Sequence, residues 1–194
     1  MKLPLSFYRR DNTLVIAKEL LGKVLVTSIR NIITSGIITE TEAYVGITDK
    51  ACHAFGGRHT ERTKIMYENG GVAYVYLCYG IHHLFNVVTH EKGEPHAILI
   101  RAIEPVDGIS EILKRRKSTS LTKTITTGPG KVSNALGIKT SHTGQLLTGK
   151  NIWIEDQGIE VRKKDILITP RIGVDYAGKD ALLPYRFCLN KKVK

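Results

Sequence analysis

The residues best suited to chemistry lie in the stretch 39–46, which reads Thr-Glu-Thr-Glu-Ala-Tyr-Val-Gly. In a strand, successive side chains point to opposite faces, so Glu40, Glu42 and Tyr44 would share one face. Two carboxylates and a phenol would then point the same way. An unpaired buried charge costs more than its packing gains, so a buried carboxylate has either a chemical task or a partner. The alternative interpretation of this stretch alone is a solvated edge strand.

A second stretch, residues 73–89, predicts two strands joined by a turn near Tyr79 and Gly80. Alternation places Tyr74 and Tyr76 on one face and apolar residues on the other. Aromatic residues favour strands, so a tyrosine-rich face packed on a core would explain this pattern. A wall of phenols beside a carboxylate is also what a pocket for a flat, electron-poor ring requires.

These residues belong to a longer series of motifs that closely resembles the alkyladenine (3-methyladenine) DNA glycosylase family. The resemblance runs in order from about the first predicted helix to Phe187, so it covers nearly the whole chain. The segments that carry it are ETEAYVG at 40–46, ACH at 51–53, GR at 57–58, YVY at 74–76, YG at 79–80, NVV at 86–88, RAIEP at 101–105, GPGK at 128–131 and RIGV at 171–174.

The resemblance implies a base-excision enzyme. An enzyme that acts on a base in duplex DNA must rotate the nucleotide out of the stack and into a pocket. The implied reaction is hydrolysis of the bond between an alkylated or deaminated purine and its deoxyribose, which leaves an abasic site. Glu42 matches the family's general base, which deprotonates the attacking water, and Arg101 matches an arginine near the phosphate and the water. For Arg101 alone, the alternative is an ordinary ion pair, for instance with Glu104.

The resemblance also assigns the pocket. Tyr44, His53 and Tyr76 match the residues that enclose the flipped base, and electron-rich rings suit the positive charge of an alkylated purine. Asn86 matches a pocket wall that distinguishes purines at their exocyclic edge. Tyr79 matches the residue at a hairpin tip that fills the gap left in the duplex. Taken singly, His53 would be a structural hydrogen-bonding residue and Asn86 a strand residue bonded to the backbone.

Contacts with the DNA backbone are expected from Arg58, Arg62 and Lys131. Lys131 lies in the first turn of a predicted helix, where free backbone amides suit a phosphate. No lysine falls at a matched pocket position to form a Schiff base, so we expect a monofunctional glycosylase without lyase activity. We expect no cofactor and no metal, because the His and Cys residues near position 53 make a poor ligand set.

Two other classes of function remain open from the residues alone. A non-catalytic nucleic-acid-binding module would use the tyrosines and the positive charge but would not need Glu42. A metal-dependent nuclease would use Glu40, Glu42, His53 and His59, and it would stop in chelator.

The chain of 194 residues has 29 Lys and Arg against 18 Asp and Glu, which gives a net charge of +11 and a pI near 9.6. This surplus favours a polyanionic partner, most commonly nucleic acid, with an affinity that falls with salt. An anionic membrane or generic solubility is the weaker explanation, and the family resemblance implies that the partner is double-stranded DNA with damaged purines. No apolar run approaches the ~18 residues that span a bilayer, and the N-terminus lacks an export signal. Three scattered cysteines indicate a reduced, intracellular protein, in the cytoplasm or nucleoid of a prokaryote. Without a long apolar stripe, we expect a monomer that does not bind membranes.

A single domain over residues 1–194, with a basic tail at about 190–194, would position these side chains. The patterns predict an α+β fold: a curved, mostly antiparallel, open-barrel-like sheet with a few helices around it and a protruding β-hairpin. Helices are predicted at 13–21, from 109 to an exposed end at 114–117, and at 129–136. Besides the hairpin, strands are predicted at 23–29, 32–44, 97–102, 153–155, 166–169, 172–174 and 185–189. The segments 45–67 and 118–127 predict long loops, the second of them mobile.

Overall fold

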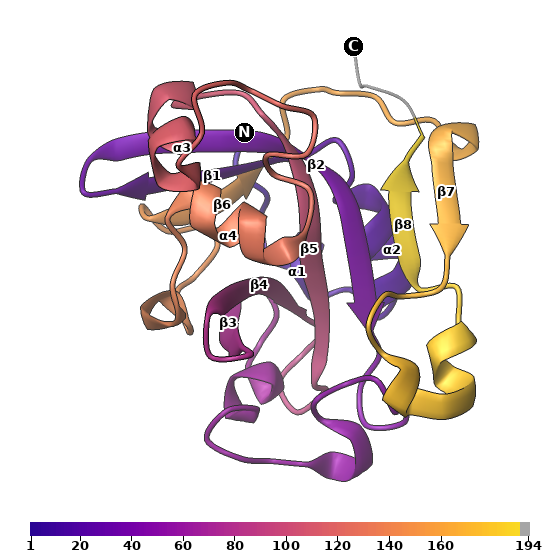
Figure 1. Cartoon of the computed structure of the whole chain (residues 1–194). Coiled ribbons are helices and arrows are strands. Elements are labelled where there is room, and N and C mark those ends of the chain that lie inside the picture. The colour runs from indigo at the N-terminus through magenta and orange to yellow at the C-terminus, as the bar shows by residue number, and fades with distance from the viewer. Residues whose placement is uncertain (191–194) are drawn as a thin grey trace.

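An eight-stranded antiparallel sheet forms the centre of the molecule (Figure 1). The computed structural model describes residues 1–190, so most of the basic tail expected at 190–194 lies outside the described residues. Six strands follow the order β3-β4-β5-β2-β1-β6, and β8 pairs with both β2 and β7. The sheet does not close on itself, and the predicted α+β fold is confirmed. The strands are β1 (Val24–Ile29), β2 (Ile32–Tyr44), β3 (Ala73–Cys78), β4 (His82–Thr89), β5 (His96–Pro105), β6 (Ile152–Glu155), β7 (Ile166–Thr169) and β8 (Arg186–Leu189).

The long strand β2 connects the parts of this sheet. Its first half pairs with β1, and its second half lies between β5 and β8. Arg30 and Asn31, in the turn between β1 and β2, have φ angles of 54° and 61°, as a tight hairpin turn requires. The second half of β2 carries Glu40, Glu42 and Tyr44, and neighbouring backbone flanks it on both edges.

A β-bulge interrupts the pairing of β2 with β5 beside these residues. The register shifts on both sides of Glu40, so that within the described sheet Thr39 and Arg101 have no direct partner in this ladder. Bulges re-aim side chains and are frequent next to active sites. Here the bulge accompanies an Arg101 side chain that points to the carboxylates of β2.

The hairpin of β3 and β4 turns where it was predicted, near Tyr79 and Gly80, and the turn has a third residue, Ile81. Tyr79 and Gly80 both have positive φ angles, 51° and 73°, which matches the twist of a tight β-hairpin. Tyr79 at the tip is 91% exposed.

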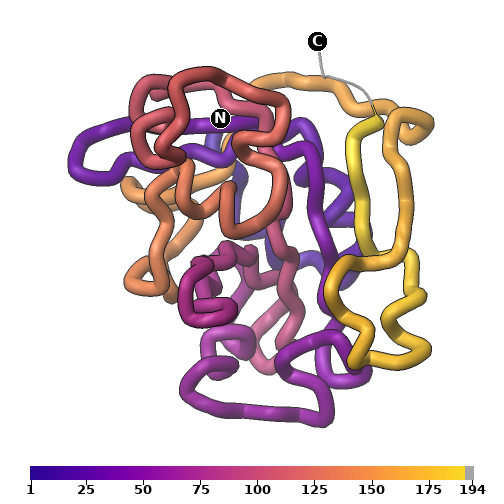
Figure 2. The backbone as a smooth tube through the Cα atoms, in the orientation of Figure 1, coloured from indigo at the N-terminus to yellow at the C-terminus, as the bar shows by residue number. Residues whose placement is uncertain are grey.

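Short helices cover the sheet. They are α1 (Leu5–Tyr8), α2 (Thr13–Glu19), α3 (Ile109–Arg116) and α4 (Pro129–Leu136), with 3-10 turns η1 (Phe55–Gly57), η2 (Lys64–Tyr67), η3 (Thr140–His142), η4 (Lys163–Asp165) and η5 (Asp175–Leu182). Asn12 caps α2 by accepting a hydrogen bond from the Val15 N–H, and Gly137 ends α4 with a φ of 71°. The helices α3 and α4 lie side by side, and α4 packs on β4 and β5 (Figures 1 and 2).

The main hydrophobic core lies between the sheet and these helices. Its largest fully buried side chains include Ile16 of α2, Phe85 of β4, Ile98 of β5, Leu136 of α4 and Phe187 of β8. Within residues 1–190, no helix has the length and apolarity needed to cross a membrane.

The structure corrects some sequence predictions. The strand predicted at 172–174 is wrong: Gly173 has a φ of 74°, and the Ile172 N–H bonds to a side chain instead of a neighbouring strand. The strand predicted at 97–102 continues to Pro105, because β5 keeps pairing with β2. The helix predicted at 13–21 ends at Glu19. The loop 118–127 is docked at its end, where buried Thr126 donates to the Ile103 carbonyl.

Candidate active site

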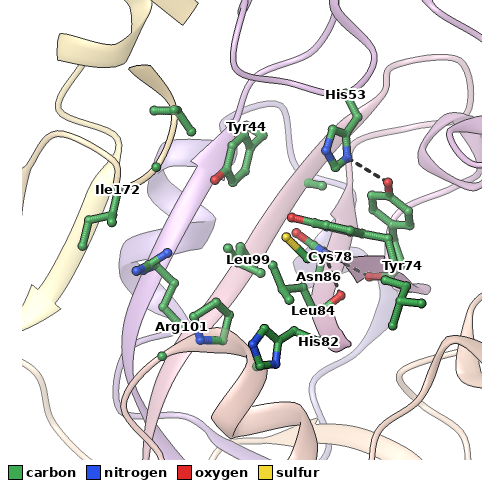
Figure 3. Close-up of a pocket in the computed structure, with 18 of the residues that line it drawn as sticks. Tyr44, His53, Tyr74, Cys78, His82, Leu84, Asn86, Leu99, Arg101 and Ile172 are labelled. Carbon is green, nitrogen blue, oxygen red and sulfur yellow. Dashed lines mark hydrogen bonds between the residues drawn. The ribbon is translucent and has the colours of Figure 1, made fainter. Parts of the chain in front are cut away.

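A cavity of about 580 Å³ lies where the second half of β2 meets the β3–β4 hairpin (Figure 3). The strand β5, the start of α4 and the segment 172–176 complete its walls. Tyr44, Arg101 and Ile172 lie on one side, and His53 and Tyr74 lie on the other (Figure 3). The cavity brings together most residues predicted for the site: Tyr44, His53, Arg62, Tyr76, Tyr79, Asn86, Arg101 and Lys131.

Glu42 lies directly behind this wall and is completely buried. The Ile172 backbone N–H donates to its Oε1 at 2.8 Å, and the Tyr44 hydroxyl donates to its Oε2 at 2.9 Å. Arg101 Nη1 also approaches Oε2, at 3.4 Å. Donors on both oxygens hold the carboxylate in one orientation. Tyr44, Arg101 and Ile172, which bond to this carboxylate, line the cavity, whereas Glu42 itself does not.

The surroundings of Glu42 act on its basicity in opposite directions. Burial raises the pKa of the Glu42 carboxyl above its ordinary value, while Arg101, the Ile172 N–H and the Tyr44 hydroxyl lower this pKa. The nearby Glu40 carboxylate adds a further upward contribution. A raised pKa makes the carboxylate a stronger base, and the donors favour its ionised form.

Glu40 anchors two arginines at the edge of the site. Its Oε1 accepts a hydrogen bond from Arg101 Nε at 2.9 Å and another from Arg186 Nε at 2.6 Å. Arg101 Nε is also 3.4 Å from the Glu42 Oε1, so this arginine bridges both carboxylates. The structure thus places Glu40 and Glu42 together, as the alternation of the strand predicted.

His53 is fixed in one tautomer on the opposite wall. Its Nε2 lies 3.0 Å from Arg62 Nη2, which can only donate, so Nε2 is the acceptor. The proton therefore sits on Nδ1, which donates to the Tyr74 hydroxyl at 2.8 Å. Burial, followed by the charges of Arg62 and Arg58, lowers the pKa of His53 to about 4. The imidazole is neutral at pH 7.

Tyr76 lines the cavity beside His53 and Arg62. Its ring meets His53 edge-on with centroids 4.7 Å apart, and the guanidinium of Arg62 lies 4.7 Å from its centre. An arginine over a tyrosine ring is a cation–π contact. This wall therefore already accommodates a positive charge.

Asn86 of β4 is almost fully buried and lines the cavity. Its Nδ2 donates to the Tyr74 carbonyl at 3.1 Å and to the Leu84 carbonyl at 3.2 Å. These bonds are those expected if Asn86 is a strand residue bonded to the backbone, which was the alternative interpretation of this residue. Among the described residues no donor bonds to its Oδ1, so this oxygen is the atom left to meet a ligand.

The remaining predicted residues lie at or beyond the rim. Tyr79 lines the mouth, as does Lys131, whose Nζ donates to the Thr124 carbonyl at 3.1 Å. Arg58 does not line the cavity, although it is close enough to contribute to the lowered pKa of His53.

Three features of the site were missed or underestimated in the sequence. Tyr74 was placed on the tyrosine face, but its bond to His53 was not predicted. The Ile172 N–H has no signature in a sequence, and the RIGV motif at 171–174 was noted only for the family resemblance and not assigned to the site. Tyr176 lines the mouth with a ring that is 70% exposed, while its hydroxyl donates to the Ala51 carbonyl at 3.1 Å.

Within the part of the chain that the structure describes, no group of three or more His, Cys, Asp or Glu side chains could hold a metal ion. Cys52, Cys78 and Cys188 are free thiols.

Comparison with known proteins places the chain beside enzymes that act on DNA bases. The model of the family described as "Methylpurine-DNA glycosylase (MPG)" matches residues 6–193. A Chlamydia felis protein named "Putative 3-methyladenine DNA glycosylase" is 51% identical over 191 residues, which cover 98% of this chain and 97% of that protein. A protein of the same name from Bacillus cereus (strain G9842) is 48% identical over 196 residues, with coverage of 96% and 95%.

Proposed function

The chain belongs to the methylpurine-DNA glycosylase family, and from this premise we propose that it excises damaged purines of the 3-methyladenine type from double-stranded DNA. It rotates an alkylated or deaminated purine out of the duplex and hydrolyses the N-glycosidic bond, which leaves an abasic site. The observation that carries this proposal is the buried Glu42 carboxylate directly behind an aromatic cavity, with a donor on each oxygen.

Glu42 acts as the general base in this reaction. Its carboxylate accepts a proton from the water that attacks the sugar carbon, while the electron pair of the broken bond leaves with the purine. Its negative charge also stabilises the oxocarbenium-like charge that develops on the deoxyribose. Arg101, which bridges Glu40 and Glu42, is placed to contact the water and the adjoining phosphate.

The water needs a path to the carboxylate. Glu42 does not line the cavity itself, and the Tyr44 hydroxyl donates to its Oε2. Because a carboxylate oxygen accepts more than one hydrogen bond, we propose that the water joins the Tyr44 hydroxyl at Oε2 when the DNA binds.

The base lies between Tyr44, His53 and Tyr76. A neutral imidazole does not repel a positively charged purine, and tyrosine faces attract it. Arg62 covers the face of Tyr76 and must leave to admit the base. Once it has left the Tyr76 ring, Arg62 binds a phosphate, which agrees with the contact with the DNA backbone expected of Arg62. Asn86 contacts the exocyclic edge of the base, where guanine differs from adenine.

The duplex is held by the hairpin tip and by basic residues. The exposed Tyr79 enters the stack where the base was, which offsets part of the unstacking cost. Arg58 and Lys131 contact phosphates beside the flipped nucleotide. A basic groove of about 880 Å³ adjoins the cavity at Lys131 and continues the positive surface. Its charged lining is Arg30, Lys114, Arg115, Arg116, Lys131 and Lys139, with Glu111 as its one acidic residue.

The enzyme is monofunctional in this proposal. Lys131 is the one lysine that lines the cavity within residues 1–190, and its ammonium is held at the mouth by the Thr124 carbonyl. A Schiff base needs an amine at the sugar carbon. Borohydride should therefore trap no covalent enzyme–DNA complex, and the reaction should leave the strand intact.

The decisive experiment compares the wild type with Glu42→Gln on duplexes that contain 7-methylguanine or hypoxanthine, in chelator. The amide keeps the shape but cannot accept the proton, so release of free base should fall at least ~100-fold while binding to DNA persists. Glu160→Gln, at an exposed glutamate outside the cavity, is the matched control and should keep the wild-type rate.

Other outcomes would contradict the proposal in distinct ways. If the wild type bound DNA tightly but released no base, a binding module would be the better interpretation. Loss of release in chelator would favour a metal-dependent reaction. Full release by Glu42→Gln would remove Glu42 as the base.

A further inference from the structure

A buried ion pair behind the cavity has no part in the mechanism above. Asp49 and Arg171 form it, with side chains that are 2% and 0% exposed. Arg171 Nη2 donates to Oδ1 of Asp49 at 2.8 Å, and Nη1 donates to Oδ2, so the contact is bidentate. Burying two charges has a desolvation cost that their attraction often only balances, so stability alone does not explain such a pair.

Arg171 is connected to each of the three consecutive residues Glu42, Ala43 and Tyr44. Its Nη1 donates to the Ala43 carbonyl at 2.9 Å, and its guanidinium lies 5.0 Å from the centre of the Tyr44 ring. The next residue in the chain, Ile172, supplies the N–H that bonds to the Glu42 carboxylate. Arg171 therefore contacts the proposed stacking ring directly and reaches the proposed base through its neighbour Ile172.

These contacts hold β2 on the edge where its pairing with β8 ends, while the other edge stays paired with β5 as far as Tyr44. The pairing of β2 with β8 ends at Glu42, and the last backbone bond on this edge runs from the Ala43 N–H to the Tyr185 carbonyl. The segment that leads from β7 to β8 lies beside this end of β2 (Figures 1 and 2). Arg171 connects this segment to β2. Its Nη2 donates to the Asp180 carbonyl, and its guanidinium also faces the Tyr185 ring.

Asp49 fixes the other end of the pair. Its Oδ2 accepts a hydrogen bond from the Val45 N–H at 3.0 Å, and its Oδ1 accepts one from the Ala51 N–H at 3.0 Å. The carboxylate thus orders the turn that follows Tyr44 while it neutralises Arg171.

We propose that Asp49 and Arg171 position Glu42 and Tyr44 for excision without touching the DNA. Arg171 supports one face of Tyr44 and leaves the other for the base, and it fixes the peptide that presents the Ile172 N–H to Glu42. Asp49 cancels the charge of Arg171, so that no net positive charge lies behind a ring that stacks on a positively charged purine. This inference rests on the proposed function, because it takes Glu42 as the base.

Arg171→Lys tests the positioning of Glu42. Lysine keeps the charge but lacks the planar fork, so the contacts with Ala43 and Tyr44 are lost. We expect lesion-DNA binding within about 3-fold of the wild type and a single-turnover rate lower by roughly 10- to 100-fold, as a small misplacement of a reacting group predicts. The acid limb of the pH–rate profile should move to higher pH, because the Ile172 N–H no longer stabilises the carboxylate. The other titratable and charged groups that interact with Glu42 remain, namely Glu40 and Tyr44 from β2, Arg101 from β5, and Arg186 and Cys188 from β8.

Asp49→Asn tests the charge compensation. It leaves the guanidinium of Arg171 uncompensated behind Tyr44, so excision of positively charged 7-methylguanine should fall at least about 5-fold more than excision of neutral hypoxanthine. A purely structural loss would lower both rates equally. If this variant does not fold, the double variant Asp49→Leu with Arg171→Met removes both charges, and it should lose both activities to the same extent.

Arg10→Lys is the matched control. Arg10 also bonds to a carboxylate, Glu19, and to a backbone carbonyl, and it lies over the Phe7 ring, but it is outside the cavity. Its rates and pH profile should equal those of the wild type. If Arg171→Lys kept the wild-type rate and acid limb while Glu42→Gln was inactive, the positioning role would be wrong and the base assignment would stand. An active Glu42→Gln would overturn both.

Discussion

At the scale of single residues, the Tyr44 hydroxyl should tune the basicity of Glu42. It donates to Oε2 at 2.9 Å and lowers the pKa of the Glu42 carboxyl. In Tyr44→Phe the ring remains to stack while this donor is lost, so the Glu42 pKa should rise further. We expect the acid limb of the single-turnover profile to shift to higher pH and the rate below it to fall about 10-fold, the effect of one hydrogen bond to a charged group. An unchanged limb would mean that the hydroxyl does not act on the base.

Tyr8→Phe is the control for this variant. The Tyr8 hydroxyl is buried in the core without a hydrogen-bond partner among the described residues, so its removal should leave excision unchanged. The free energy of unfolding should not fall, because no hydrogen bond is lost.

The sequence predicted some residues of the site better than others, for physical reasons. Alternation along one strand places Glu40, Glu42 and Tyr44 together, and this is a local property. The Ile172 N–H and the Asp49–Arg171 pair come from segments more than 100 residues apart along the chain. Neither a backbone donor nor a distant ion pair has a local pattern, so only the folded chain shows these contacts.

At the scale of elements, the β3–β4 hairpin should act through its tip. Tyr79 is 91% exposed and makes little contribution to packing, so Tyr79→Ala should change the free energy of unfolding by less than about 0.5 kcal/mol. Its affinity for a lesion duplex should fall by about 10- to 100-fold, since stacking on a base contributes about 1–3 kcal/mol. Fluorescence of a 2-aminopurine beside the lesion reports the flipping. Leu167→Ala, at an exposed position of β7, should leave both the affinity and the fluorescence unchanged. If Tyr79→Ala and Leu167→Ala had equal effects, the hairpin tip would not be the intercalating element.

The elements that the sequence predicted are those with strong local signals. Each hairpin turn has one residue suited to positive φ, Asn31 or Gly80, and α4 begins with Pro129 and ends at Gly137. The segment 172–174 was mistaken for a strand because a short apolar run does not reveal whether a partner strand exists. The bulge at Arg101 was also invisible, since it depends on the register of β5 against β2.

At the scale of the whole molecule, composition indicated a polyanionic partner but not where it binds. The basic groove is assembled from the β1–β2 turn, α3, α4 and the segment before η3, so its charges come from distant parts of the sequence. Arg115 and Arg116, part of a run interpreted as solvated, instead bond to the Ala135 and Ile125 carbonyls. A second groove on the molecule, called the balanced groove below, is nearly neutral, with Lys18, Lys23 and Lys163 against Glu19 and Asp156. The contrast indicates one face for DNA.

This contrast leads to a salt-dependence prediction. Each lysine that neutralises a phosphate contributes about 1 to the slope of log affinity against log salt. Lys114→Gln and Lys139→Gln, at exposed positions of the basic groove, should each reduce this slope by about 1 and weaken binding equally for lesion and undamaged duplexes. Lys163→Gln carries the same change in net charge but lies in the balanced groove, and it should leave the slope unchanged. Equal slopes for all three variants would show that net charge, and not the basic groove, attracts the DNA.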